Sequence, residues 1–112
     1  MKKHNFIRQL LTPINRTPIH PQWFAFLHES QSLDDIAKNA NGLVLDIGAG
    51  AQNIQKFLHS DCNYISLDYY QTAIEWYNTR PQLFGDGQCL PVKTDSVDTV
   101  LLLDVLEHLS RP

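Results

Sequence analysis

The chain has 112 residues, of which 43% are hydrophobic and 19% charged, so its apolar content suffices for one packed core. Its formal net charge of −3 gives no basic field for nucleic acid, and no apolar run approaches the roughly 18 residues of a membrane span. Cys62 and Cys89 are isolated, with neither the spacing of metal ligands nor a disulfide framework. These features favour a soluble cytoplasmic protein with no metal, nucleic-acid or membrane partner.

Residues 1–41 differ in character from the rest and are expected to form an N-terminal arm with helices. Three prolines and scattered charges in the first 21 residues predict an irregular arm. The apolar run that follows predicts a short helix over residues 22–29. Ser32 followed by Asp35 resembles a capping box, which predicts a second helix over residues 33–40.

The most informative pattern lies in residues 43–51. The nearly continuous apolar run over residues 43–47 is typical of a strand buried on both faces of a parallel sheet. Gly48 and Gly50 then let the backbone turn sharply and admit a ligand against bare main chain. Residues 52–59 can begin a helix whose first N–H groups point back at this loop. Strand, glycine loop and helix indicate a nucleotide-cofactor site, and a simple turn is the alternative.

Asp68 ends a second predicted strand, and it follows Gly48 by 20 residues. An acid at this place can accept hydrogen bonds from both ribose hydroxyls of an adenosine. The alternative is that Asp68 caps the next helix, since aspartate is a good N-cap. That helix is expected over residues 71–80, with Ala73, Ile74 and Tyr77 on its buried face.

A third strand at Leu83–Phe84 leads into Gly85-Asp86-Gly87. The carboxylate of Asp86 could accept a hydrogen bond from an adenine amino group, while the backbone N–H that follows meets a ring nitrogen. The alternative is an ordinary turn, which these residues favour regardless of function.

A fourth strand is expected over residues 97–103, with residues 104–108 at its carboxyl end. Open α/β sheets bind their ligands at that end of the strands. The order of elements predicts an α/β fold, a Rossmann-like three-layer α/β/α arrangement with a mostly parallel sheet.

Together these segments resemble the class I S-adenosylmethionine-dependent methyltransferases, in particular the type 11 group. The first motif of that family, an acid before G-x-G-x-G, is matched by Asp46, Gly48 and Gly50. Its acid after the second strand is matched by Asp68. Gln52 stands where the family usually has a third glycine, so the approach of the methionine part of the cofactor is expected to differ there.

Three further motifs of the family follow in its order. Its G-D-A-x-x-L-P is matched by residues 85–91, with Gly87 in place of the alanine, and its D-S-F-D-x-V by residues 95–100, with Val97 in place of the phenylalanine. Residues 105–112 resemble the V-L-E-H-V-x-x-P of small-molecule O-methyltransferases. Helices before the first strand often cover the cofactor in this family, which implies that role for the helix with Trp23 and Phe24. The alternative is that these two side chains pack on the face of the sheet.

The resemblance implies S-adenosyl-L-methionine as the cofactor and a small molecule as the methyl acceptor. His108 is the only histidine near the predicted site, and its unperturbed pKa of about 6.5 suits a general base; capping or packing is the alternative. No metal site is expected. The residues implied to bind the cofactor are Asp46, Gly48, Ala49, Gly50, Asp68, Tyr69, Asp86, Gly87 and Asp104.

The family domain has seven strands, whereas this sequence stops just after the fourth. Residues 42–112 are therefore expected to form a cofactor-binding half-domain truncated after the fourth strand and inactive by itself. The open edge of that strand is expected to self-associate or to pair with a chain that completes the sheet.

Two other functions are consistent with the same residues. The first is a non-catalytic module that holds the cofactor or serves an assembly. The second is an NAD-dependent oxidoreductase, although Asn53 replaces the third glycine of the G-x-G-x-x-G fingerprint. Asp46 ahead of the glycines and the turn at Gly85-Asp86 favour methyl transfer over the second.

Overall fold

The computed structural model describes the backbone of residues 23–112 and the side chains from residue 27 onward. The chain divides into two units, residues 1–35 and 36–112, and the second unit contains the whole sheet. The predicted irregular arm and the side chains of Trp23 and Phe24 lie outside the described residues.

A single helix, α2 (Trp23–Ala37), stands where two helices were predicted. The prediction of a second helix start was wrong because the hydroxyl of Ser32 donates to the carbonyl oxygen of His28, one turn earlier, at 3.0 Å. A hydroxyl bonded in this way continues a helix instead of capping a new one. Residues 29–35 also contain no glycine or proline that would end it.

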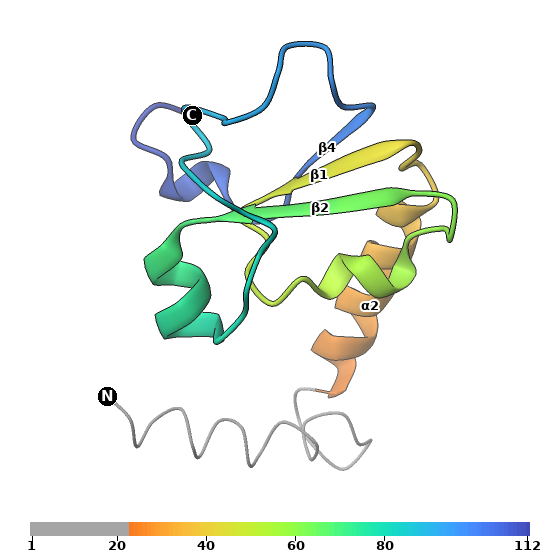
Figure 1. Cartoon of the computed structure of the whole chain (residues 1–112). Helices are drawn as coiled ribbons and strands as arrows, with labels where there is room; N and C mark the ends of the chain where they lie inside the picture. The colour runs from red at the N-terminus through yellow and green to blue at the C-terminus, as the bar shows by residue number, and fades with distance from the viewer. Residues whose placement is uncertain (1–22) are drawn as a thin grey trace. The chain divides into compact units, whose positions relative to one another are not determined.

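Four parallel strands form the sheet, in the order β3-β2-β1-β4 (Figure 1). They are β1 (Leu43–Ile47), β2 (Asn63–Asp68), β3 (Leu83–Phe84) and β4 (Thr99–Leu102). The expected Rossmann-like α/β fold is thereby confirmed, with the first and fourth strands as neighbours.

The strand β4 is shorter at both ends than predicted. At its start the carboxylate of Asp98 accepts the N–H of Leu43 at 2.7 Å, so this side chain bonds to the first residue of β1. Asp104, two residues after the last residue of β4, has a left-handed φ of 54°. Such a φ is incompatible with extended backbone, so pairing stops before that residue.

Alternation along β1 and β2 gives the sheet one apolar and one partly polar face. Leu45, Ile47 and Leu67 form the centre of the apolar face, and the loop between β3 and β4 covers them with Leu90, Val92 and Val97. The other face carries Asp46, Ser66 and Asp68, all three of them buried. The polar face therefore requires hydrogen-bond partners wherever a buried side chain cannot reach water.

Both crossover helices are shorter than predicted. The first is a 3-10 segment, η2 (Asn53–Phe57), which buries Ile54. The second is π-helical, η3 (Thr72–Tyr77), and ends where Asn78 takes a left-handed φ of 53°. Ala73 is buried as expected, but the prediction for Tyr77 was wrong, since its side chain is exposed.

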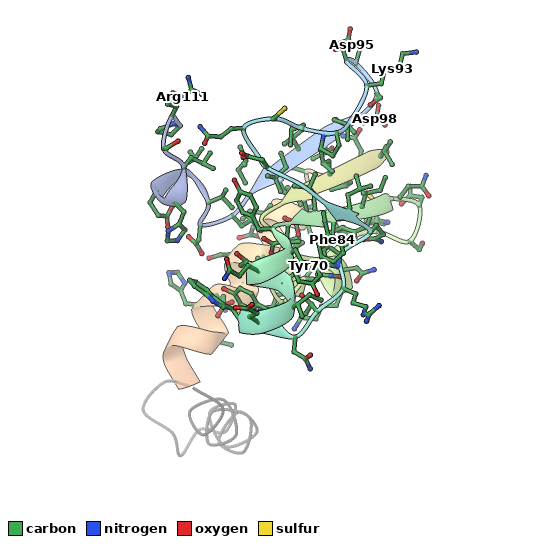
Figure 2. All side chains as sticks on the ribbon, turned by 60° about the vertical axis from the view of Figure 1, so that its left-hand side comes forward. Tyr70, Phe84, Lys93, Asp95, Asp98 and Arg111 are labelled. Atoms are coloured by element: carbon green, nitrogen blue, oxygen red, sulfur yellow. The ribbon has the colours of Figure 1, made fainter. Side chains whose placement is uncertain are left out.

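An aromatic pair lies near the ends of β2 and β3. The rings of Tyr70 and Phe84 have centroids 5.3 Å apart at an interplanar angle of 53° (Figure 2). Tilted rings at this separation attract each other modestly. The pair joins the residues just after β2 to the end of β3.

Candidate functional site

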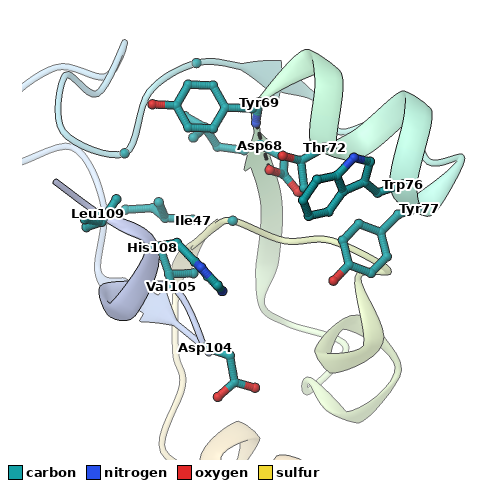
Figure 3. A pocket seen from close by; sticks show the side chains of 14 residues that line it. Ile47, Asp68, Tyr69, Thr72, Trp76, Tyr77, Asp104, Val105, His108 and Leu109 are labelled. Carbon is teal, nitrogen blue, oxygen red and sulfur yellow. Dashed lines mark hydrogen bonds between the residues drawn. The ribbon is translucent and has the colours of Figure 1, made fainter.

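A cavity of about 340 Å³ lies at the carboxyl ends of the parallel strands (Figure 3). Its wall comes from the ends of β1 and β2, from η3, from the loop after β3 and from the segment after β4. The lining residues are Ile47, Gly48, Leu67, Asp68, Tyr69, Thr72, Trp76, Tyr77, Gly85, Gly87, Asp104, Val105, His108 and Leu109. This is the edge at which open α/β sheets bind ligands.

The glycine loop brings bare backbone to the cavity. Gly48 has a φ of 70°, and its N–H donates to the carbonyl oxygen of Leu67 at 2.8 Å. A Cβ at this position would lie 2.5 Å from Cγ2 of Val105, which is closer than real contacts allow. Glycine is therefore required at residue 48 by both conformation and space.

Asp68 presents a fixed carboxylate to the cavity. The residue is only 4% exposed. Its Oδ2 accepts the N–H of Gly50 at 2.8 Å, and its Oδ1 accepts the N–H of Tyr69, also at 2.8 Å. Each oxygen retains further acceptor capacity. The carboxylate is therefore held in place while it can still accept hydrogen bonds from a ligand.

Asp46 lies behind the loop, away from the cavity wall. It is 2% exposed, and its Oδ2 accepts the hydroxyl of Tyr64 at 2.6 Å. Burial raises the pKa of Asp46 above 3.8 and the nearby carboxylate of Asp68 adds to this, while the bond from Tyr64 opposes it. The Asp46 side chain is thus bonded within the sheet, to Tyr64 of β2.

The Gly-Asp-Gly segment forms a turn, and the expected contact of Asp86 with an adenine stays a prediction. Oδ1 of Asp86 accepts the N–H of Gln88 at 2.8 Å, and Asp86 pairs with Cys89 across the turn. A hydrogen bond to Asp86 raises the pKa of the exposed Tyr69 hydroxyl above 10.0. Gly87 lines the cavity, whereas Asp86 stands beside it.

Two titratable side chains enter the cavity wall after β4. Asp104, in its left-handed conformation, is solvent-exposed. The side chain of His108 is 77% exposed, and its Nε2 lies 4.0 Å from Oε1 of Glu107. Figure 3 shows His108 and Val105 across the cavity from Trp76 and Tyr77.

Most of the expected site residues are gathered at one place. Gly48, Asp68, Tyr69, Gly87, Asp104 and His108 line the cavity. Asp46, Ala49, Gly50 and Asp86 do not, although Ala49, Gly50 and Asp86 are hydrogen-bonded to residues that do.

Sequence reasoning missed the aromatic part of the wall. Thr72, Trp76 and Tyr77 come from η3, and Trp76 is 68% exposed although it lines the cavity. A large ring left open at a cavity is typical of a binding surface. The only available signal was the adjacent aromatic pair at residues 76 and 77.

Within residues 23–112, no three His, Cys, Asp or Glu side chains lie close enough together to hold a metal ion. No helix in that part of the chain is long and apolar enough to cross a bilayer.

A parallel sheet with a glycine loop, a fixed acid at the end of β2 and a cavity at the carboxyl ends of the strands defines a Rossmann-like α/β fold. A family model described as a methyltransferase domain matches residues 45–112, which is more than half of the chain. The chain belongs to this methyltransferase family, as its resemblance to class I enzymes predicted. No curated protein and no solved structure matches it significantly.

Proposed function

We propose that the chain binds S-adenosyl-L-methionine in the cavity and serves the transfer of its methyl group to a small-molecule acceptor. The observation that carries the proposal is the buried carboxylate of Asp68, fixed by the N–H groups of Gly50 and Tyr69 at the cavity wall. A fixed carboxylate suits the paired hydroxyls of a ribose, which donate two hydrogen bonds side by side.

The remaining walls fit the other parts of this cofactor. The adenine would lie toward Tyr69 and Gly87, and the methionine part would follow the glycine loop, where a Cβ at Gly48 has no space. The cavity volume of about 340 Å³ falls within the range of small-molecule sites.

The chemistry divides between cofactor and protein. When bound, the sulfonium group supplies a good leaving group for in-line displacement. The protein supplies alignment, and apolar side chains such as Ile47, Val105 and Leu109 exclude water from the reacting atoms. His108 is the proposed general base, because it alone among the histidines of the described residues lines the cavity.

The acceptor is proposed to be a small molecule in the cytoplasm. The sequence after β4 is that of small-molecule O-methyltransferases by resemblance, and a formal charge of −3 provides no attraction for nucleic acid. Cys62 and Cys89 are both free thiols, as expected in a reducing compartment.

Calorimetric titration of the 112-residue chain tests the cofactor. Heat is expected from S-adenosylmethionine and from S-adenosylhomocysteine. None is expected from NADP, since no Arg or Lys follows Asp68 closely to meet a 2′-phosphate. Heat from NAD with none from the adenosyl pair would refute the proposal and favour an oxidoreductase.

Trp76 offers a second readout, because a ligand in the cavity would cover its exposed ring. The only other tryptophan is Trp23, so a Trp23→Phe variant isolates the signal. Its fluorescence should change on addition of S-adenosylhomocysteine, with the same midpoint as the heat. A Trp76→Phe variant is the matched control and should show no such change.

A further inference from the structure

Gly50 is held by hydrogen bonds on both sides of its α-carbon. Its N–H donates to Oδ2 of Asp68 at 2.8 Å, and its carbonyl oxygen accepts the hydroxyl of Thr79 at 2.9 Å. The first bond belongs to the peptide before Gly50 and the second to the peptide after it. Together they restrict both dihedral angles of a glycine, the residue type with the most backbone freedom.

Thr79 is itself placed by the end of the second crossover. Asn78 turns the chain with a left-handed φ of 53°, and the N–H of Thr79 then donates to the carbonyl oxygen of Ala73 at 2.8 Å. The Thr79 hydroxyl carries one proton, and Gly50 offers a closer acceptor than Ala73, at 2.9 Å against 3.5 Å. The short contact to Gly50 is therefore its main hydrogen bond.

The side chain of Tyr77 also contacts Gly50. A Cβ built on Gly50 would lie 3.2 Å from Cζ of the Tyr77 ring, so the ring packs directly against the loop. Both Thr79 and Tyr77 come from the same short segment, and the loop is thereby tied to η3. None of the sequence motifs of the cofactor site includes this segment.

We infer that Thr79 is a positioning residue of the cofactor site, which acts through Gly50 on the carboxylate of Asp68. With its carbonyl held by Thr79, Gly50 keeps its N–H directed at Asp68, and the carboxylate is presented to the ligand in one orientation. Preorganisation of this kind increases affinity without any contact to the ligand. The inference rests on the proposed function, since it names a residue that supports the same site.

Calorimetry with S-adenosylhomocysteine on Thr79 variants of the full chain tests the inference. Thr79→Val is nearly isosteric and removes the hydroxyl, so the affinity should fall about 3- to 10-fold. Thr79→Ser keeps the hydroxyl and should bind like the wild type. Thr94→Val is the matched control, because Thr94 is exposed and remote from the loop in sequence. Should Thr79→Val not fold, Thr79→Ala replaces it in the same comparison with Thr79→Ser.

A double-mutant cycle separates positioning from a merely structural role. In an Asp68→Ala background, the effect of Thr79→Val should shrink below about 2-fold, because its route to the ligand is gone. An undiminished effect in that background overturns the inference, as does wild-type affinity in Thr79→Val or a loss in Thr79→Ser equal to that in Thr79→Val.

Hydrogen exchange without ligand distinguishes the inference about Thr79 from the proposed function. The amide proton of Gly50 should exchange slowly in the wild type and in Thr79→Ser, and faster in Thr79→Val. Equal exchange in all three contradicts the role of Thr79, whereas slow exchange without any binding of S-adenosylhomocysteine contradicts the proposed function alone.

Discussion

The hydroxyl of Tyr64 donates a 2.6 Å hydrogen bond to Oδ2 of Asp46, and the bond joins β2 to β1 just before the glycine loop. Burial and this bond raise the pKa of the Tyr64 hydroxyl above 10.0, so Tyr64 remains the donor at neutral pH. A buried acid next to a glycine loop therefore has a fixed partner within the sheet.

Tyr64→Phe should lower the free energy of unfolding by about 1.5–3 kcal/mol, the range for a hydrogen bond to a charged group. The substitution leaves Asp46 buried without its donor. Urea denaturation at neutral pH measures the change. Tyr70→Phe is the matched control, because Tyr70 is 63% exposed, and it should change stability little.

The raised pKa of Asp46 predicts a pH dependence with a definite sign. The folded chain holds this proton more tightly than the unfolded chain, so the stability that Asp46 contributes is complete below pH 3.8 and is lost as the pH rises through its folded pKa. An Asp46→Asn variant lacks that loss. Its free energy of unfolding, relative to the wild type, should increase from about pH 4 to pH 8 in urea titrations; a constant difference would contradict the assignment.

Asp68→Ala should affect both binding and stability. Loss of the two ribose bonds should weaken S-adenosylhomocysteine binding by about 1.5–3 kcal/mol, and loss of the bond to Gly50 should lower the free energy of unfolding by about 1–3 kcal/mol. The effect on stability is expected because Asp68 is buried. Calorimetry and denaturation test the two parts separately, with the exposed Asp61→Ala as control. A lower melting temperature with unchanged affinity would make Asp68 purely structural.

Gly48→Ala should be strongly destabilising, by more than about 2 kcal/mol, since a left-handed φ and a clash with Val105 add together. Adding Val105→Ala should recover the part that is due to the clash and leave the part due to φ. Thermal unfolding of the two single variants and the double variant measures both parts. Full additivity of the two substitutions would show that the methyl group does not meet Val105.

We also expect the chain to self-associate through β4. This strand pairs with β1 on one side and with no strand of the described residues on the other, and its Val100 and Leu102 are 47% and 42% exposed. An apolar edge of this kind pairs readily with a second copy. Light scattering with size exclusion should show a dimer or larger species in the wild type and a monomer in Val100→Lys. A wild-type monomer at micromolar concentration would contradict the expectation.

The positions of the strands could be predicted from the sequence because each signal is local, although β4 begins later and ends earlier than predicted. The apolar run of β1, the acid that ends β2 and the glycines between them dictate the same structure in almost any context. Asp68, Gly87 and His108 lie at the cavity because parallel strands bring their carboxyl ends to one edge.

The helices could not be predicted as well, because their boundaries depend on side-chain hydrogen bonds and on the type of helical turn. The hydrophobic pattern of the sequence shows neither of these. Ser32 can cap a new helix or bond back into an existing one, and only the geometry shows the second. In η3 the wider π-helical turn changes which side chains share a face. A period of 3.6 therefore placed Tyr77 in the core, whereas it lines the cavity beside Trp76.

The position of β1 between β2 and β4 has a consequence for the order in which the chain assembles. The partners Leu43 and Asn63 are 20 positions apart, whereas Val44 and Thr99 are 55 apart. Closing the longer loop costs more chain entropy, so β2 should join β1 before β4 does. The wall with Asp104 and His108 would then form last and open first. A ligand that contacts both this wall and the end of β2 would stabilise the last part of the sheet to form. It should therefore protect the amide protons of β4 from exchange more than those of β2.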